Sequence, residues 1–311
     1  MHLRGLDMNL LVALDALIKD KSISRSGERL HLSQSGMSTA LSRLREYFAD
    51  QLLVRIGRQM VLTPLAESLA DPVHDVVLQV QAIIDHTPAF DPAHSERNIT
   101  IMVSDYVATT FLPQLLQRVH AEAPRIVVDL VSQEDHVHGP LARGEIDFLI
   151  IPEQFTSPDH PSQRLFSDSY VCIAWSENSA IGDHLDLDTY MAAGHVVARF
   201  GATRKPTIES WLVDRFQQQR LVEVSVMNFS TVPYFVIGTE RIATVHARLA
   251  ELYVQSMPLR IYPTPFEAPR IVEAVQWHRF SDKHPLTIWL RSLMLELGAQ
   301  FDRTSPGAHG T

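Results

Sequence analysis

The sequence has few of the features that would place it outside the cell, in a membrane or among enzymes. Its 311 residues include one cysteine, Cys172, so no disulfide can form within the chain, which is typical of a reducing compartment. No apolar run approaches the length of a membrane span, and the N-terminus lacks the charged and apolar regions of a signal peptide. We therefore expect a soluble, cytoplasmic protein with no membrane partner.

Recognisable catalytic and metal-binding patterns are also missing. There is no glycine-rich phosphate loop, and no Ser, His and acid set stands in a nucleophile context. Among 15 histidines the densest pair is His136 and His138, which has no cysteine partner and no second cluster at ligand spacing. Cys172 lies within an apolar stretch and is interpreted as a small core residue rather than a redox sensor. The sequence thus predicts no catalytic residue, no metal and no cofactor.

Positive charge is scarce overall but unevenly distributed. The net charge is −9, yet residues 1–60 contain nine basic and six acidic residues, a net charge of +3. The remainder contains 18 basic and 30 acidic residues, a net charge of −12. This asymmetry favours a basic head on an acidic body, although an excess of this size also fits chance variation.

Three helices are predicted near the N-terminus. The first covers about residues 6–18 and the second about 22–30. The second contains Ser26 and Gly27, which are small enough to let another helix pack closely. Ser33 is a natural N-cap for the third helix. Two helices separated by three or four residues, the second with a polar outer face, are typical of a helix-turn-helix.

The third helix has an unusual outer face. Met37, Leu41 and Leu44 recur at helical spacing and form its apolar side. The other side carries short hydrogen-bonding groups, which suit a helix in the major groove because Gln, Ser and Arg can bind base edges or phosphates. The residues predicted to contact DNA from this helix are Gln34, Ser35, Ser38, Thr39 and Arg43. A helix buried against another domain would also favour small polar residues, and this alternative stays open here.

A β-hairpin is predicted after the third helix. Two short strands, about 52–55 and 60–62, flank a turn that contains Gly57. This arrangement is typical of the wing of a winged helix-turn-helix. Arg55 and Arg58 near its tip are expected to lie beside the phosphate backbone of double-stranded DNA.

A long helix follows, capped by Thr63 with Pro64 at its first position. Apolar residues recur in it at every third or fourth position, which is typical of a coiled-coil stripe that pairs two chains. The stripe consists of Leu65, Leu69, Val73, Val76, Val80 and Ile83. Pro72 removes one backbone donor, so we expect a bend there. The alternative is a helix packed on the body of its own chain.

Strands and helices alternate in the rest of the chain, which predicts an α/β body with a mostly parallel sheet. The expected strands are 98–104, 126–131, 146–151, 169–175, 195–200, 222–227, 242–246, 259–263 and 270–278. Two expected helices follow the first two strands and end near residues 121 and 144. The others cover about 208–218, 232–237, 247–254 and 285–297. The last strand and helix would return to the first part of this body.

Residues 28–64, ERLHLSQSGMSTALSRLREYFADQLLVRIGRQMVLTP, resemble the winged helix-turn-helix of LysR-type transcriptional regulators. The chain differs from the usual pattern at three places. It has Ser26 and Gly27 for paired alanines, Ser35 for the proline of a Ser-Gln-Pro turn, and Leu65-Ala66 where a glycine usually follows Thr-Pro. These changes exchange small residues or lie outside the contacts, although the helix start must then rely on capping by Ser33.

The segments LADPV (69–73) and FDPAHSER (90–97) resemble the branch that contains nodulation regulators and regulators of aromatic degradation. The resemblance covers nearly the whole chain and implies a homodimer through the long helix, a homotetramer built as a pair of dimers, and an operator with an inverted repeat. The implied parts are a winged helix-turn-helix DNA-binding domain (1–62), a linker and dimerisation helix (63–88), and a two-lobed, periplasmic-binding-protein-like effector domain (95–303). Lobe I would comprise 95–164 and 269–303, and lobe II 165–268.

An effector is expected at the carboxyl ends of the strands, where open α/β sheets bind ligands. The residues predicted there are Ser104, Asp105, Phe200, Thr203, Asn228 and Phe229. Their aromatic rings and short polar groups favour a small aromatic effector with a hydroxyl or carboxylate. Ser104 and Asp105 are equally well interpreted as helix N-caps, and each Phe as a core residue.

The resemblance adds three positions to this predicted site. Phe111 and Arg248 resemble positions that regulators of aromatic degradation use around their effectors, and Ser169 replaces a histidine used by some relatives. Arg248 could pair with a carboxylate or phenolate, with a surface cation as the alternative.

Two functions of different classes agree with this organisation. The first is a DNA-binding transcriptional regulator that responds to a small aromatic effector and activates a catabolic operon through RNA polymerase. The second is an α/β enzyme, for example a hydrolase, with a DNA-binding regulatory head. The lack of a catalytic constellation favours the first, so we predict that the protein is not an enzyme.

Overall fold

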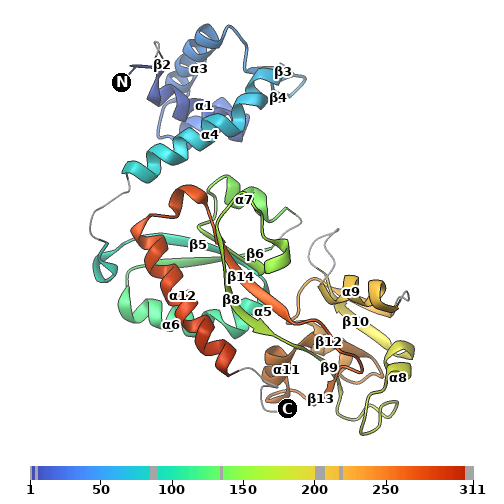
Figure 1. Ribbon diagram of the computed structural model, residues 1–311. Coiled ribbons are helices and arrows are strands. Elements are labelled where there is room, and N and C mark those ends of the chain that lie inside the picture. The colour runs from blue at the N-terminus through green and yellow to red at the C-terminus, as the bar shows by residue number, and fades with distance from the viewer. Residues whose placement is uncertain are drawn as a thin grey trace. The chain divides into compact units, whose positions relative to one another are not determined.

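The computed structural model describes residues 2–3, 6–84, 90–133, 136–199, 207–216 and 220–304 (Figure 1). The chain forms two compact units, an N-terminal unit (Met1–Thr87) and a C-terminal unit (Pro88–Thr311). Within the described ranges, no helix has the length and apolar character needed to cross a membrane.

The N-terminal unit contains the predicted three helices, hairpin and long helix. Its elements are β1 (His2–Leu3), β2 (Leu6–Asp7), α1 (Met8–Asp20), α2 (Ile23–Arg29), α3 (Gln34–Phe48), β3 (Leu53–Ile56), β4 (Gln59–Leu62) and α4 (Pro64–Ile84). The capping residues fix where the helices begin. Asp7 accepts a hydrogen bond from the Asn9 amide, and Ser33 from the Gly36 amide, so α1 starts two residues later than predicted and α3 starts where predicted.

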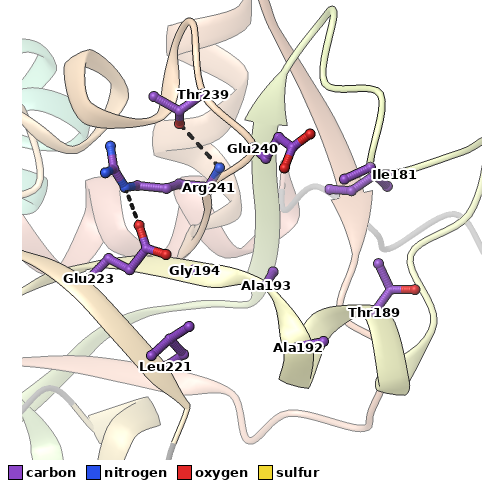
Figure 2. A pocket seen from close by; sticks show the side chains of 11 residues that line it. Ile181, Thr189, Ala192, Ala193, Gly194, Leu221, Glu223, Thr239, Glu240 and Arg241 are labelled. Carbon is purple, nitrogen blue, oxygen red and sulfur yellow. Dashed lines mark hydrogen bonds and ion pairs between the residues drawn. The ribbon is translucent and has the colours of Figure 1, made fainter.

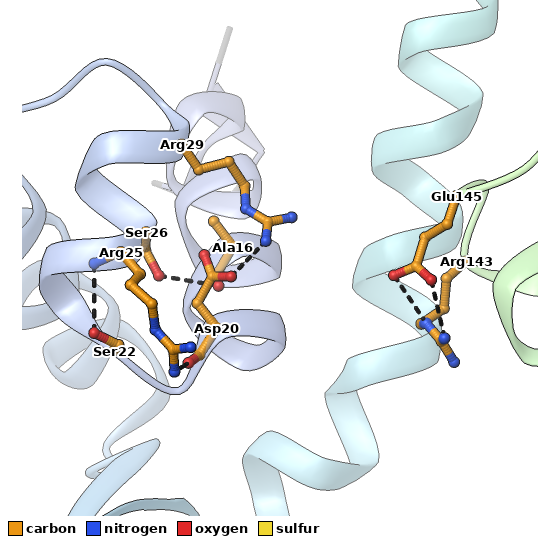
Figure 3. A network of polar contacts seen from close by, with 8 residues as sticks. All are labelled: Ala16, Asp20, Ser22, Arg25, Ser26, Arg29, Arg143 and Glu145. Carbon is orange, nitrogen blue, oxygen red and sulfur yellow. Dashed lines mark hydrogen bonds and ion pairs between the residues drawn. The ribbon is translucent and has the colours of Figure 1, made fainter. Parts of the chain in front are cut away.

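Small residues allow α1 and α2 to pack closely. The buried Ser26 hydroxyl of α2 donates to the Ala16 carbonyl of α1 at 3.0 Å (Figure 3). At Gly27 an added Cβ would lie 2.9 Å from the Leu32 carbonyl oxygen, which is too close for any other residue without movement of the backbone. The interpretation of Ser26 and Gly27 as small packing residues is therefore confirmed.

Helix α4 joins the core of its own unit along its first half. Ala66 and Val73 are buried there with the apolar side of α3, and Leu69 packs against the same core. Val76 is 38% exposed and Ile83 is 73% exposed. Leu69 and Val73 of the predicted stripe thus pack within the chain, and pairing of two chains through the stripe stays a prediction. The helix is continuous across Pro72.

Two mixed five-stranded sheets form the C-terminal unit. The first, in lobe I, has the order β6-β5-β7-β14-β8. Its strands are β5 (Asn98–Val103), β6 (Val127–Ser132), β7 (Phe148–Pro152), β8 (Ser162–Asp168) and β14 (Ile271–Trp277). Its helices are α5 (Asp105–Thr110), α6 (Leu112–Glu122), α7 (His138–Ala142) and α12 (Pro285–Arg303). Helix α12 packs along β8 and α6, as predicted for the returning C-terminal segment (Figure 1).

The second sheet, in lobe II, has the order β11-β10-β12-β9-β13. Its strands are β9 (Tyr170–Trp175), β10 (Gly194–Ala198), β11 (Leu221–Val226), β12 (Ile242–His246) and β13 (Leu259–Pro263). Its helices are α8 (Leu187–Ala192), α9 (Thr207–Phe216), α10 (Val232–Val236) and α11 (Ala247–Val254). Short 3₁₀ turns lie at Pro92–His94, Glu153–Phe155 and Arg279–Ser281.

The prediction of a mostly parallel sheet is wrong in detail. In lobe I, β5 pairs in parallel with β6 and β7, but β14 is antiparallel to β7 and β8. In lobe II, β10 is parallel to β11 and β12, whereas β9 is antiparallel to β12 and β13. The antiparallel pairs arise where the chain crosses between lobes, from β8 to β9 and from β13 to β14. Strand β8 and helix α8 were not predicted.

One apolar core extends through both lobes. It includes Tyr106 and Phe166 of lobe I together with Phe229 and Val245 of lobe II. The lobes are therefore in direct contact in this structure, and the junction between them is lined with aromatic rings.

Candidate functional site

The outer face of α3 is the first candidate surface. Its apolar residues Met37, Leu41 and Leu44 are fully buried. The predicted contact residues Gln34, Ser35, Thr39 and Arg43 are exposed, and Ser38 is half-buried. This helix face is therefore not buried within the N-terminal unit.

Some of these polar groups are already hydrogen-bonded within the chain, and others are not. The Ser33 and Ser35 hydroxyls lie 3.0 Å apart, and the Thr39 hydroxyl donates to the Ser35 carbonyl at 2.9 Å. The Gln34 and Arg43 side chains make no hydrogen bond or ion pair within the described ranges. These two have their full hydrogen-bonding capacity available to a partner.

The hairpin of β3 and β4 presents a basic tip. Gly57 has φ +61°, a conformation that favours glycine, and it turns the chain between the strands. Arg55 and Arg58 are exposed on either side of it. The Arg55 Nε donates to the Gly57 carbonyl at 3.1 Å, whereas the Arg58 side chain has no partner in the part of the chain that is described.

Other arginines of the N-terminal unit hold its elements together. Arg29 pairs with the carboxylate of Asp20, and Arg25 donates to the Asp20 carbonyl (Figure 3). Arg45 of α3 donates from Nε to the Gln51 carbonyl and from Nη2 to the Leu53 carbonyl, both at 2.8 Å. Arg45 thereby joins α3 to the first strand of the hairpin.

The second candidate site lies at the junction of the two lobes. Ser104 caps α5 through the Val107 amide, as its N-cap interpretation predicted. Asp105 instead reaches lobe II, where its Oδ2 accepts from the Ser230 amide at 2.7 Å and hydroxyl at 2.6 Å. The other oxygen of Asp105, Oδ1, is buried and has no hydrogen-bond partner among the described residues.

An aromatic stack closes this junction. Tyr106 and His246 are nearly parallel, with ring centroids 3.8 Å apart, and Phe229 meets His246 edge-on at 4.6 Å. Burial lowers the pKa of His246 to about 3, so its ring is neutral, and its Nδ1 has no partner in the described ranges. The Tyr106 hydroxyl donates to Asp168 at 2.7 Å, and burial raises the pKa of that carboxyl. Asp168 and Ser230 were missed by sequence reasoning because Asp168 stands just before a predicted strand and Ser230 is one residue beyond the two assigned to the end of strand 222–227.

Two further predicted residues, Phe111 and Arg248, pack against Phe301 of α12. Phe111 is fully buried and stacks on Phe166 in lobe I. The Arg248 guanidinium lies 4.1 Å from the Phe301 ring centre and donates to the Phe301 carbonyl at the end of α12. The expectation that Phe111 faces the cleft is therefore wrong, because its ring packs in the core against Phe166 and Phe301. The pairing of Arg248 with an effector stays a prediction.

The remaining predicted residues have local roles or lie outside the described ranges. Asn228 Oδ1 accepts from the Thr231 amide at 3.1 Å, and the Ser169 carbonyl accepts from the Ala247 amide at the crossover between lobes. Phe200 and Thr203 lie outside the described residues. No cluster of three metal-binding side chains occurs in the described part of the chain.

Two family descriptions match the chain. The bacterial regulatory helix-turn-helix of the LysR family matches residues 8–67, and the LysR substrate-binding domain matches residues 92–299. The first range contains α3 and the hairpin, and the second contains the junction of the two lobes.

Curated relatives and a solved structure agree with these matches. Nodulation protein D of Bradyrhizobium sp. (strain ANU 289) is 40% identical over 296 residues, covering 95% of this chain and 88% of the relative. Nodulation protein D 1 of Rhizobium meliloti (strain 1021) is 39% identical over 305 residues, covering 98% and 99%. A single-substitution variant of OxyR from Pseudomonas aeruginosa, solved at full length, shares the fold, with a TM-score of 0.73 over 95% of each chain at 14% identity. The chain therefore belongs to the LysR family and is a DNA-binding transcriptional regulator, not an enzyme.

Proposed function

We propose that this regulator binds an inverted-repeat operator as a dimer and changes its activity when a small aromatic effector binds at the junction of its lobes. The observation that carries the DNA-binding part is the exposed face of α3, where Gln34 and Arg43 have no partner in the described ranges. Gln pairs with adenine and Arg with guanine or phosphate, so these two residues would read bases. Ser35, Ser38 and Thr39 would add contacts to base edges or flanking phosphates.

The hairpin would contribute affinity rather than sequence preference. Arg55 and Arg58 are exposed at its tip, and arginines at such a position neutralise phosphates whatever the base sequence. The base-specific contacts would thus come from α3 and the uniform electrostatic contacts from the hairpin.

The second half of α4 is the proposed dimer contact. Val76, Ile83 and Ile84 are large apolar residues that remain exposed at its end. A second copy of the chain would cover them and place two α3 helices on successive major grooves, about 34 Å apart. We further infer a tetramer of two such dimers, built through the C-terminal units.

The effector part of the proposal rests on the junction of Tyr106, Phe229 and His246. Stacked rings suit a planar ligand, and two buried polar atoms beside them, Asp105 Oδ1 and His246 Nδ1, lack partners in the described ranges. A carboxylate oxygen needs a donor, so we propose an effector that carries a phenolic hydroxyl. Aromatic acids are less favoured, because their carboxylate would meet that of Asp105.

The genes under control follow from the resemblance alone. We infer that the effector activates a catabolic operon for aromatic compounds, which requires the DNA-bound protein to contact RNA polymerase. The relatives named nodulation protein D make nodulation genes the second candidate target.

Selection of binding sites from random duplex DNA tests the DNA-binding part. The wild-type protein should enrich an inverted repeat, and Gln34→Ala should change the preferred bases. Gln300→Ala, an exposed glutamine of the C-terminal unit, is the matched control and should enrich the wild-type sequence. If Gln34→Ala selects the same sequences in the same order, Gln34 does not read bases.

A thermal-shift screen with phenols, hydroxybenzoates and flavonoids tests the effector part. A ligand that binds the folded state raises the unfolding temperature. The shift should be lost in Asp105→Ala and kept in Asp183→Ala, an exposed aspartate elsewhere. A shift of equal size in both variants would place the effector at another site.

A further inference from the structure

Lobe II contains a pocket that the proposed effector site does not use. Its volume is about 570 Å³, within the range of about 300–1,000 Å³ typical of small-molecule sites. It lies where β10, β11 and β12 begin, since Gly194, Leu221 and Arg241 stand at or just before the first residues of these parallel strands. His246 and the lobe junction lie at the other end of β12. The pocket is therefore separate from the junction.

The residues that line the pocket include acidic, basic and apolar side chains. Glu223 and Arg241 form an ion pair at 2.7 Å on one side of the pocket, and Ile181 and Thr189 lie on the other (Figure 2). Ile181 is buried, and the alanines at the end of α8 add further apolar surface. A ligand here would meet charged groups and an apolar wall together.

The hydrogen-bonding capacity of these charged groups is only partly used. Arg241 donates to Glu223 from Nε, which leaves both terminal Nη groups without partners among the described residues. The Glu240 carboxylate also lines the pocket, on the opposite side of the Arg241 main chain from the guanidinium in Figure 2, and it has no partner in the described ranges. The two terminal nitrogens of a guanidinium form a fork that matches a carboxylate.

Gly194 leaves room for the Glu223 carboxyl group at this pocket. A Cβ added at Gly194 would lie 2.4 Å from the Glu223 carboxyl carbon, so the glycine leaves the space in which that carboxylate pairs with Arg241. The pocket thus has a partly exposed acid–base pair and a second acid, Glu240, without a partner in the described ranges.

We propose that this pocket binds a free α-amino acid with a short aliphatic side chain. The Nη fork of Arg241 would bind its carboxylate, and Glu240 with the remaining oxygen of Glu223 would bind its ammonium group. The side chain would lie against Ile181 and Leu221. A ligand at the start of β12 could affect the junction at the end of the same strand, but only through a difference in affinity between arrangements of the lobes.

Calorimetric titration of the full-length protein, without DNA or aromatic compounds, tests this proposal independently of the proposed function. The probes are L-norvaline, n-butylamine, which lacks the carboxylate, and pentanoate, which lacks the ammonium. We expect saturable binding of norvaline and at least about tenfold weaker binding of the other two, because each lacks one charge-assisted hydrogen-bonding group.

Variants locate the binding within the pocket. Glu240→Gln and Arg241→Gln should each weaken norvaline binding about tenfold or more, whereas the exposed controls Glu267→Gln and Arg260→Gln should leave it unchanged. Ala192→Phe fills the pocket from an exposed helix position and should abolish binding without affecting the core. The proposal is overturned if norvaline does not bind at millimolar concentration, if butylamine binds equally well, or if Ala192→Phe binds as the wild type does.

Discussion

The Asp105 carboxylate of lobe I accepts two hydrogen bonds from Ser230 of lobe II, one from its amide at 2.7 Å and one from its hydroxyl at 2.6 Å. This contact lies beside the stacked rings of Tyr106 and His246, which also come from different lobes. The lobes are therefore held together at the place where the effector is proposed to bind. An effector that separates them must replace these contacts with its own.

Loss of the Ser230 hydroxyl should loosen the junction. We expect Ser230→Ala to lower the free energy of unfolding of the C-terminal unit by about 1 kcal/mol, because one hydrogen bond to a charged group is lost and the amide bond remains. All four tryptophans lie between residues 175 and 289, so their fluorescence during urea unfolding reports on this unit alone. A double-mutant cycle with Asp105→Asn should show coupling between the two residues. Strict additivity would mean that the contact contributes nothing.

The buried histidines predict an acid-sensitive C-terminal unit. Burial lowers the pKa of His195 and of His246 to about 3, from an ordinary value near 6.5. Between these values the unfolded state binds protons that the folded state does not, so stability falls as pH decreases from about 6.5 to about 3. Each histidine adds about 1.4 kcal/mol per pH unit to this slope.

His246→Phe keeps an aromatic ring against Tyr106 and removes one titrating group. The slope of unfolding free energy against pH, measured between pH 4 and 6, should decrease by about 1.4 kcal/mol per unit. The exposed His184→Gln is the control and should keep the wild-type slope. An unchanged slope in His246→Phe would show that His246 is protonated in the folded protein.

The hairpin tip predicts a change in salt dependence. Arg58→Ala should weaken binding to every DNA sequence to the same extent and reduce the slope of log K against log salt by about one. Binding measured by fluorescence anisotropy at several salt concentrations gives this slope, with Arg260→Ala as the control. A change in base preference instead would assign Arg58 a role in reading bases.

The exposed end of α4 predicts how the protein assembles. Val76→Asp combined with Ile83→Asp should produce monomers that remain folded, because neither side chain is part of the core of the N-terminal unit. Leu69→Asp should instead destabilise that unit, since Leu69 packs against its core. Light scattering gives the mass and circular dichroism the folded fraction. A dimer mass for the double variant would exclude this end of α4 as the dimer contact.

Local signals in the sequence were sufficient for much of the N-terminal unit. The cap at Ser33 and the apolar spacing of Met37, Leu41 and Leu44 act within one helix, so they identified both the start of α3 and its exposed face. Which residues of α4 are buried and which are exposed was not predictable from such local signals. Val73 and Val76 continue one stripe, and packing against the rest of the N-terminal unit determines that one is buried and the other exposed.

At the candidate effector site, contacts between distant parts of the chain were also not predictable from the sequence. Ser104 and Asp105 were correctly placed at the end of a strand, because the sequence pattern of β5 and α5 is local. The partner of Asp105 comes from a residue 125 positions later, and Arg248 is bound by the far end of α12. No periodicity or spacing reports such contacts, which depend on how the two lobes close on each other.

Arg45 connects α3 to the hairpin through two backbone carbonyls, those of Gln51 and Leu53. These two hydrogen bonds oppose a change in the separation of the helix and the hairpin. We therefore expect the DNA to change its shape when the protein binds. Operators would then differ in affinity according to how readily their base steps bend or their minor groove narrows, even at positions that no side chain contacts.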